Sequence, residues 1–280
     1  MKKFVKKLIV DSLPLRLRKG LAIWLNRQAW IDAADRAYWA TELLTDFAAT
    51  DVNAYHKFLW RHHLAYAETY EIALRFGYDK LNQTRRLFFA ELPQRLAAAG
   101  VASAHDVRSV LEIGCSLGYL LRHIETDVFP SATRLEGLDI DVRAIEEGAR
   151  YLREQGSKIE LHVGDMEEMG PILGDSRFDL VLGSGVLLYL DEPSAAKLVA
   201  AMLRYTGKLL AITALAHPDT DNSSLDRSVP RARDGTWIHN VDRMIVESGG
   251  RVVARRYEGG KLVDGNTVYF LYAVPAAAGT

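Results

Sequence analysis

The stretch Val110-Leu111-Glu112-Ile113-Gly114-Cys115-Ser116-Leu117-Gly118 decides the fold, and Tyr119-Leu120-Leu121 follows it. The mostly apolar run before Gly114 predicts a buried strand, and the residues after Gly118 predict a helix. Gly114 permits a tight turn, and Gly118 permits a close approach of the backbone to a ligand. The amide groups at the start of the helix lack partners within it, so they can bind a carboxylate as readily as a phosphate. The stretch therefore predicts a strand, a ligand-binding turn and a helix.

Further short apolar runs follow, and stretches with helical periodicity, such as residues 140–154 and 192–204, separate them. This alternation predicts a parallel sheet covered by helices on both faces. Gly259-Gly260 and Asp264-Gly265 lie between the last two runs and predict an antiparallel hairpin. We expect an α/β fold, a Rossmann-like, doubly wound seven-stranded sheet with an antiparallel last strand. Its strands are expected at residues 108–113, 134–139, 158–163, 178–183, 208–213, 251–257 and 266–274.

The amino-acid composition is different in the part of the chain before this predicted sheet. Residues 30–106 are rich in good helix formers and contain few glycines, so they predict helices throughout. We expect residues 1–84 to form a helical N-terminal extension or lid and residues 85–280 to form the cofactor-binding domain.

Two acidic residues follow expected strands at the ligand-binding edge of the sheet. Asp139 ends the second strand and can accept hydrogen bonds from ribose hydroxyls, while Ile140 can pack on an adenine face. Asp165 follows the third strand and can accept a bond from an adenine amino group, and Met166 adds a polarisable contact. These positions favour a cofactor that contains a nucleoside.

Four motifs together resemble the class I S-adenosylmethionine-dependent methyltransferases, over roughly residues 85–274. The resemblance implies that Glu112 lies near the methionine part of the cofactor, Asp139 holds the ribose and Asp165 contacts the adenine. It also implies that the segment around Ser184 lines the site beside the sulfonium. The motifs are E-I-G-C-S-L-G (112–118), G-L-D-I-D (137–141), V-G-D-M (163–166) and F-D-L-V-L-G-S-G-V-L-L-Y-L (178–190).

The glycine turn departs from the family in one place, because Ser116 stands where the middle glycine is usual. We expect Ser116 to serve with a negative φ, and its hydroxyl can bond the cofactor carboxylate. A nicotinamide-dependent dehydrogenase is the nearest alternative, but its G-x-G-x-x-G fingerprint does not match G-C-S-L-G-Y. The sequence therefore favours S-adenosylmethionine as the cofactor.

Candidate catalytic bases are histidines. His239 lies in a polar loop between the fifth and sixth expected strands and can accept a hydroxyl proton, or else it or Asn240 caps the following helix. In a helix expected over residues 52–76, His56 and His63 share one face with aromatic residues. This face is either a lid that supplies a base or a packing seam with inert histidines.

The net charge and the amino-acid composition limit the kinds of substrate and metal that we expect the chain to bind. The net charge of −1 offers no basic field for nucleic acid, so we expect no nucleic-acid substrate. The single cysteine, Cys115, excludes an internal disulfide and a cysteine-held cluster in one chain. No carboxylates stand at ligand spacing, so we predict no metal, and the cytoplasm is the expected location.

Residues 1–29 are basic, with a leucine at every fourth position from Leu13 to Leu25. Such a segment either lies on an anionic membrane, at its inner face, or packs on its own domain or on a second subunit as a homodimer. We expect methyl transfer to an oxygen of a small molecule or sugar. The alternatives are a membrane-associated enzyme that modifies a glycan and a non-catalytic cofactor-binding module that acts as a sensor or scaffold.

Overall fold

The computed structural model describes residues 12–64, 81, 83–232, 234–263 and 266–276. The chain divides into two compact units: residues 1–71 together with 141–143, and residues 72–140 together with 144–280. The boundary expected between residues 84 and 85 stays a prediction, because 65–80 lie outside the described residues. No helix within the described ranges has the length and apolar character needed to cross a bilayer.

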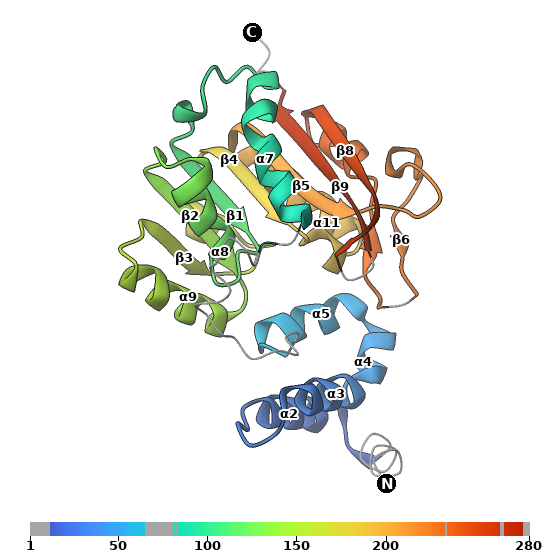
Figure 1. Cartoon of the computed structure of the whole chain (residues 1–280). Helices are drawn as coiled ribbons and strands as arrows, with labels where there is room; N and C mark the ends of the chain where they lie inside the picture. Colours follow the sequence, from blue (N-terminus) through green and yellow to red (C-terminus); the bar gives the residue numbers. More distant parts are fainter. Residues whose placement is uncertain (1–11, 65–80, 82, 233, 264–265, 277–280) are drawn as a thin grey trace. The chain divides into compact units, whose positions relative to one another are not determined.

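The second unit contains a seven-stranded sheet with the order β3-β2-β1-β4-β5-β9-β8 (Figure 1). The first five strands along the chain pair in parallel, while β9 is antiparallel to both β5 and β8. The predicted fold class is confirmed. The strands are β1 (Ser109–Ile113), β2 (Arg134–Asp139), β3 (Ile159–Val163), β4 (Phe178–Ser184), β5 (Thr206–Leu215), β8 (Gly250–Val263) and β9 (Asn266–Pro275).

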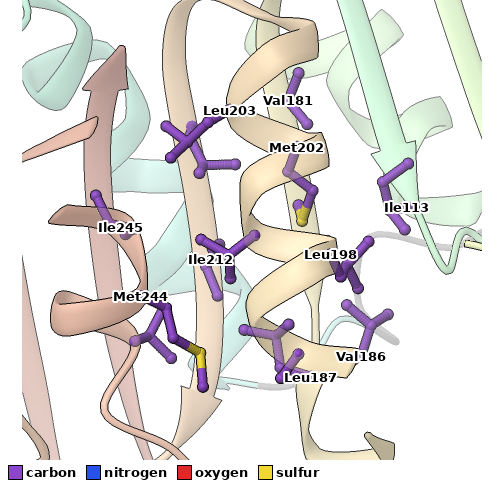
Figure 2. Packing of buried hydrophobic residues seen from close by; sticks show 14 of the residues in the cluster. Ile113, Val181, Val186, Leu187, Leu198, Met202, Leu203, Ile212, Met244 and Ile245 are labelled. Atoms are coloured by element: carbon purple, nitrogen blue, oxygen red, sulfur yellow. The ribbon is translucent and has the colours of Figure 1, made fainter. Parts of the chain in front are cut away.

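Helices cover this sheet and bury its apolar strands in two core clusters. Figure 2 shows Leu198 and Met202 of α11 packed among Ile113 and Val181 of the central strands. The helices of this unit are α7 (Gln83–Ala98), α8 (Tyr119–His123), α9 (Val142–Glu154), α10 (Gly170–Leu173), α11 (Glu192–Tyr205) and α12 (Val241–Glu247), with short turns η2 (Ala104–Asp106), η3 (Ile124–Val128), η4 (Leu187–Tyr189) and η5 (Asn222–Ser224).

Two local predictions about the last third of the chain are wrong. The loop expected between the fifth and sixth strands contains a small antiparallel sheet of β6 (Val229–Pro230) and β7 (Trp237–Ile238). Gly259-Gly260 lies inside β8 rather than in a turn, where the register with β9 shifts between Glu258 and Val263. An irregularity of this kind accommodates glycines within a strand. Asp264-Gly265 lies outside the described residues.

The first unit is built from α2 (Leu15–Asn26), α3 (Ala33–Leu43), α4 (Thr45–Thr50) and α5 (Val52–Arg61). Its core includes Ala22 of α2, Leu43 of α3 and Phe47 of α4. Arg18 of α2 is buried. It donates to the carbonyl of Leu43 at 3.1 Å and pairs with Asp46 at 3.1 Å. Burial of a paired arginine fixes how α2 lies against its neighbours.

The prediction of one continuous helix over residues 52–76 is wrong, because α5 ends at Arg61. His63 has a φ of 58°, and the Leu64 amide donates to the Leu59 carbonyl at 2.7 Å. Helices commonly end in this way, with a residue in the left-handed conformation followed by an amide that donates to a carbonyl five residues earlier. His56 therefore lies in a helix and His63 does not, and the rest of the expected face, including Ala67 and Tyr70, lies outside the described residues.

Candidate active site

The first glycine turn and the end of β2 meet at the carboxyl edge of the sheet. The amides of Gly114 and Cys115 donate to the Leu138 carbonyl at 2.8 and 3.2 Å. The Ser116 amide donates to Oδ2 of Asp139 at 2.8 Å. Since β1 and β2 are parallel neighbours, their ends place the turn beside the acid, as the sequence predicts.

The glycines of this turn are required for conformation and space. Gly114 has a φ of 72°, and a Cβ there would lie 2.2 Å from Cγ1 of Val186. Gly118 has a φ of 78° and precedes the first turn of α8. Val186 was not predicted as a site residue, because Gly114 and Val186 lie in segments that follow different strands.

Ser116 corrects the expectation of a negative φ, because its φ is 52°. The left-handed region costs a residue with a side chain about 1–2 kcal/mol relative to the usual one. Asp139 offsets this cost by accepting the Ser116 amide. The turn thus keeps the backbone shape that a glycine would take, with a hydroxyl added.

Glu112 carries the clearest electrostatic signature of the site. Its side chain is 1% exposed, and its Oε2 has no hydrogen-bond partner among the described residues. Burial raises the pKa of Glu112 well above its usual value, Arg85 opposes the rise and Asp139 adds to it. The guanidinium of Arg85 lies 5.2 Å from the ring centre of Tyr119, the first residue of α8.

An unsatisfied buried carboxyl oxygen is costly in a folded protein. A cationic ligand group would both pair with it and favour its charged form. The ammonium of a methionine moiety has this chemistry, so Glu112 fits the methionine end of S-adenosylmethionine. Arg85 lies near enough to Glu112 to lower the pKa of its carboxyl group.

The remaining predicted cofactor contacts lie at the ends of β2, β3 and β4. The Gly164 amide donates to the carbonyl of Asp139 at 2.9 Å, which joins the ends of β3 and β2. Oδ1 of Asp165 accepts the Glu167 amide at 3.1 Å. Met166 packs against the core, Ile140 is half-buried, and the Ser184 hydroxyl lies 3.3 Å from that of Thr213. Their roles toward the cofactor stay predictions.

The imidazole of His239 forms hydrogen bonds with two other segments of the chain. Its Nδ1 lies 2.7 Å from the Ser228 hydroxyl and its Nε2 lies 3.0 Å from the Leu187 carbonyl. A carbonyl only accepts, so Nε2 carries the proton and Nδ1 accepts from Ser228. Asn240 caps α12 by accepting the Arg243 amide at 2.9 Å. This geometry suits a residue that holds the segment after β4, and its role as a base stays a prediction.

We expect His239 to make the protein less stable in mild acid. Burial is the main cause that lowers the pKa of His239 from 6.5. The unfolded chain therefore binds the proton more readily, so this contribution is present above about pH 6.5 and is lost as the pH falls toward the folded pKa. The free energy of unfolding, measured with urea at pH 7.5 and 5.5, should fall less for His239→Gln than for the parent. An identical fall in both proteins would contradict this assignment.

The other two predicted bases lie in the first unit. His56 is buried in α5. Nδ1 of His63 lies 2.6 Å from Oδ2 of Asp141, a residue of the same unit that is 1% exposed. A carboxylate on one ring nitrogen fixes the orientation of the ring. A catalytic role for His56 or His63 stays a prediction.

One group of three potential metal ligands occurs in the part of the chain that the structure describes: Glu136, Glu160 and His162. Glu136 already accepts from Arg134 at 2.6 Å and lies 3.2 Å from His162. Because these contacts occupy both oxygens of Glu136, the group carries no metal assignment, and the absence of a metal stays a prediction.

Comparison with known proteins agrees with this geometry. A sequence model described as "Methyltransferase domain" matches residues 110–208. A malonyl-[acyl-carrier protein] O-methyltransferase of Halalkalibacterium halodurans is 26% identical over 145 residues, which are 51% of this chain and 52% of that protein. This chain thus matches about half the length of that relative.

Two solved structures share the fold. A SAM-dependent methyltransferase of Leishmania major superposes with a TM-score of 0.59 at 16% identity, covering 81% of this chain and 84% of the other. Magnesium protoporphyrin IX methyltransferase of Synechocystis, solved with bound S-adenosylhomocysteine, gives 0.50 at 11% identity, with 81% and 100% covered.

The glycine turn, the acid at the end of β2 and the strand order define a nucleoside-binding α/β domain. The matched residues narrow this class: residues 110–208 match a methyltransferase domain, and solved S-adenosylmethionine-dependent methyltransferases share the fold, which supports S-adenosylmethionine as the cofactor.

Proposed function

We propose that the protein transfers a methyl group to an oxygen atom of a small molecule or sugar. The observation that carries the cofactor half of this proposal is the unsatisfied, buried Oε2 of Glu112 beside the glycine turn. The choice of oxygen is supported by the curated relative, which is an O-methyltransferase. The net charge of −1 disfavours a nucleic-acid acceptor.

The residues of the site serve mainly to position the cofactor. Bound S-adenosylmethionine supplies a methyl group that is already activated by its sulfonium, so the protein needs to align it and exclude water. Glu112 pairs with the ammonium of the methionine part, and Asp139 accepts from the ribose while it holds the Ser116 amide. His239 fixes the Leu187 carbonyl and with it the segment after β4, beside which the acceptor binds.

Binding of the cofactor is expected to release a proton from Glu112. A raised pKa means that Glu112 is protonated over a wider pH range before binding, and an ammonium partner stabilises the carboxylate. S-adenosylmethionine should therefore bind more tightly as the pH rises toward the pKa of the free protein. Glu112→Gln should weaken binding about 10- to 150-fold and remove this pH dependence, since a charged hydrogen bond contributes roughly 1.5–3 kcal/mol.

Calorimetric titration with S-adenosylmethionine and S-adenosylhomocysteine, in buffers of different ionisation enthalpy, measures both affinity and proton release. Glu168→Gln, an exposed carboxylate after β3, is the matched control and should behave as the parent. Equal affinity in Glu112→Gln would remove Glu112 from the cofactor site. Binding of both ligands without demethylated product, for any hydroxylated or carboxylated acceptor, would favour a non-catalytic sensor or scaffold.

A further inference from the structure

The first unit exposes large apolar side chains on and just after α2. Leu17 is 57% exposed, Trp24 52% and Trp30 77%. Leu17 and Trp24 are seven residues apart and so share one helical face, and Trp30 follows the end of the helix. We call these three residues, with the exposed Arg16 and Arg27, the α2 face.

The side of α2 next to this face packs within the unit, where Arg18 and Ala22 are buried. Leu21 and Leu25 pack against the core of the unit. The ammonium of Lys19 lies 3.5 Å from the ring centre of Phe47. The leucine repeat expected to mark the membrane side is therefore divided, since two of its members are packed and Leu17 is exposed.

The charged residues of α2 and of the segment that follows it as far as Ile31 are all basic, and the first acidic residue after them is Asp32. Residues 12–31 contain three arginines and one lysine but no aspartate or glutamate. Arg18 and Lys19 are engaged within the unit, which leaves Arg16 and Arg27 exposed beside the apolar residues. Exposed apolar side chains flanked along the helix by exposed arginines are complementary to an anionic bilayer, which has negative headgroups over an apolar interior.

We propose that the α2 face docks on an anionic lipid bilayer. Tryptophan is favoured at the boundary between headgroups and acyl chains, because its ring is apolar and its N–H is polar. The arginines would contact lipid phosphates. A second copy of this chain fits the face less well, since a two-fold contact brings the same patch, and so the same positive charges, together.

Sedimentation of the full chain with vesicles tests this assignment. We expect binding to vesicles of phosphatidylglycerol and phosphatidylcholine, weak binding to phosphatidylcholine alone, and loss of binding in high salt, which screens exposed charges. Arg16→Gln with Arg27→Gln should reduce partitioning about 25-fold, at about fivefold for each arginine. Trp24→Ser with Trp30→Ser should reduce it by about tenfold or more.

Tyr257→Ser is the matched control, because Tyr257 is a 55% exposed aromatic residue of β8. It should partition as the parent does. S-adenosylmethionine affinity, measured in parallel, should be unchanged in every variant, which separates docking from the proposed function. Absence of binding to anionic vesicles, or full binding by the tryptophan variant, would overturn the proposal. A dimer in light scattering that the tryptophan variant abolishes would instead assign the face to self-association.

Discussion

Gly114→Ala is expected to lower the free energy of unfolding by about 2–5 kcal/mol and to abolish measurable binding of S-adenosylmethionine. Two costs add. The left-handed conformation at a φ of 72° costs a side chain about 1–2 kcal/mol. The new Cβ would also lie 2.2 Å from Cγ1 of Val186, a short and stiff side chain, and overpacking of this kind costs about 1–3 kcal/mol.

Two companion variants separate these costs. Gly156→Ala has a similar φ of 64° but meets nothing within 4 Å, so it should lose only the conformational part, with unchanged cofactor affinity. Adding Val186→Ala to Gly114→Ala should recover part of the lost stability. Urea unfolding and calorimetry provide both readouts. If Gly114→Ala is no less stable than Gly156→Ala, the close contact with Val186 does not exist.

Asp139→Ala is expected to weaken S-adenosylmethionine binding by about 1–3 kcal/mol, which calorimetry detects as a rise in Kd. The substitution removes the acceptor for ribose hydroxyls, and it also removes the oxygen that lies 2.8 Å from the Ser116 amide. Because Ser116 has a positive φ, loss of this bond should loosen the turn as well. Affinity should therefore fall more than stability does.

Asp179→Ala is the control for a structural carboxylate that binds backbone amides and pairs with Lys208 at 3.0 Å. Asp179 lies near the start of β4, and its Oδ2 accepts the amides of Arg108 and Ser109 at 2.7 and 3.1 Å. Its loss should cost about 1–2 kcal/mol of stability and leave the cofactor affinity unchanged. An Asp139→Ala protein that binds S-adenosylmethionine as tightly as the parent would show that the ribose site is misassigned.

The sheet and the turn were predictable because their signals are local. Short apolar runs separated by stretches of helical periodicity are typical of strands in a parallel sheet, and β1, β2 and β4 are mostly buried. The positions of Gly114 and Asp139 follow from the same rule, since parallel strands present their carboxyl ends at one edge. The predicted seven strands accordingly correspond to β1–β5, β8 and β9.

The predictions that were wrong concern backbone conformations that the local sequence pattern does not specify. The local sequence does not show that Ser116 has a positive φ, because its amide donates to Asp139, which lies in a different strand. The periodicity across residues 52–76 predicted a continuous helix, yet α5 ends at Arg61 and His63 has a left-handed conformation. Periodicity indicates which side chains share a helical face and does not indicate where the helix ends.

The sequence by itself predicted the fold class, the cofactor and the edge of the sheet at which that cofactor is expected to bind, because short apolar strands followed by glycines and acids are a local pattern. Only the tertiary structure decided what the polar groups do: Oε2 of Glu112 is buried without a hydrogen-bond partner among the residues that the structure describes, while both ring nitrogens of His239 are hydrogen-bonded. It also decided that Trp24 is exposed while Leu21 is packed. The physical reason is that burial and hydrogen bonding depend on neighbours distant in sequence, and these neighbours set the charge and the availability of each group.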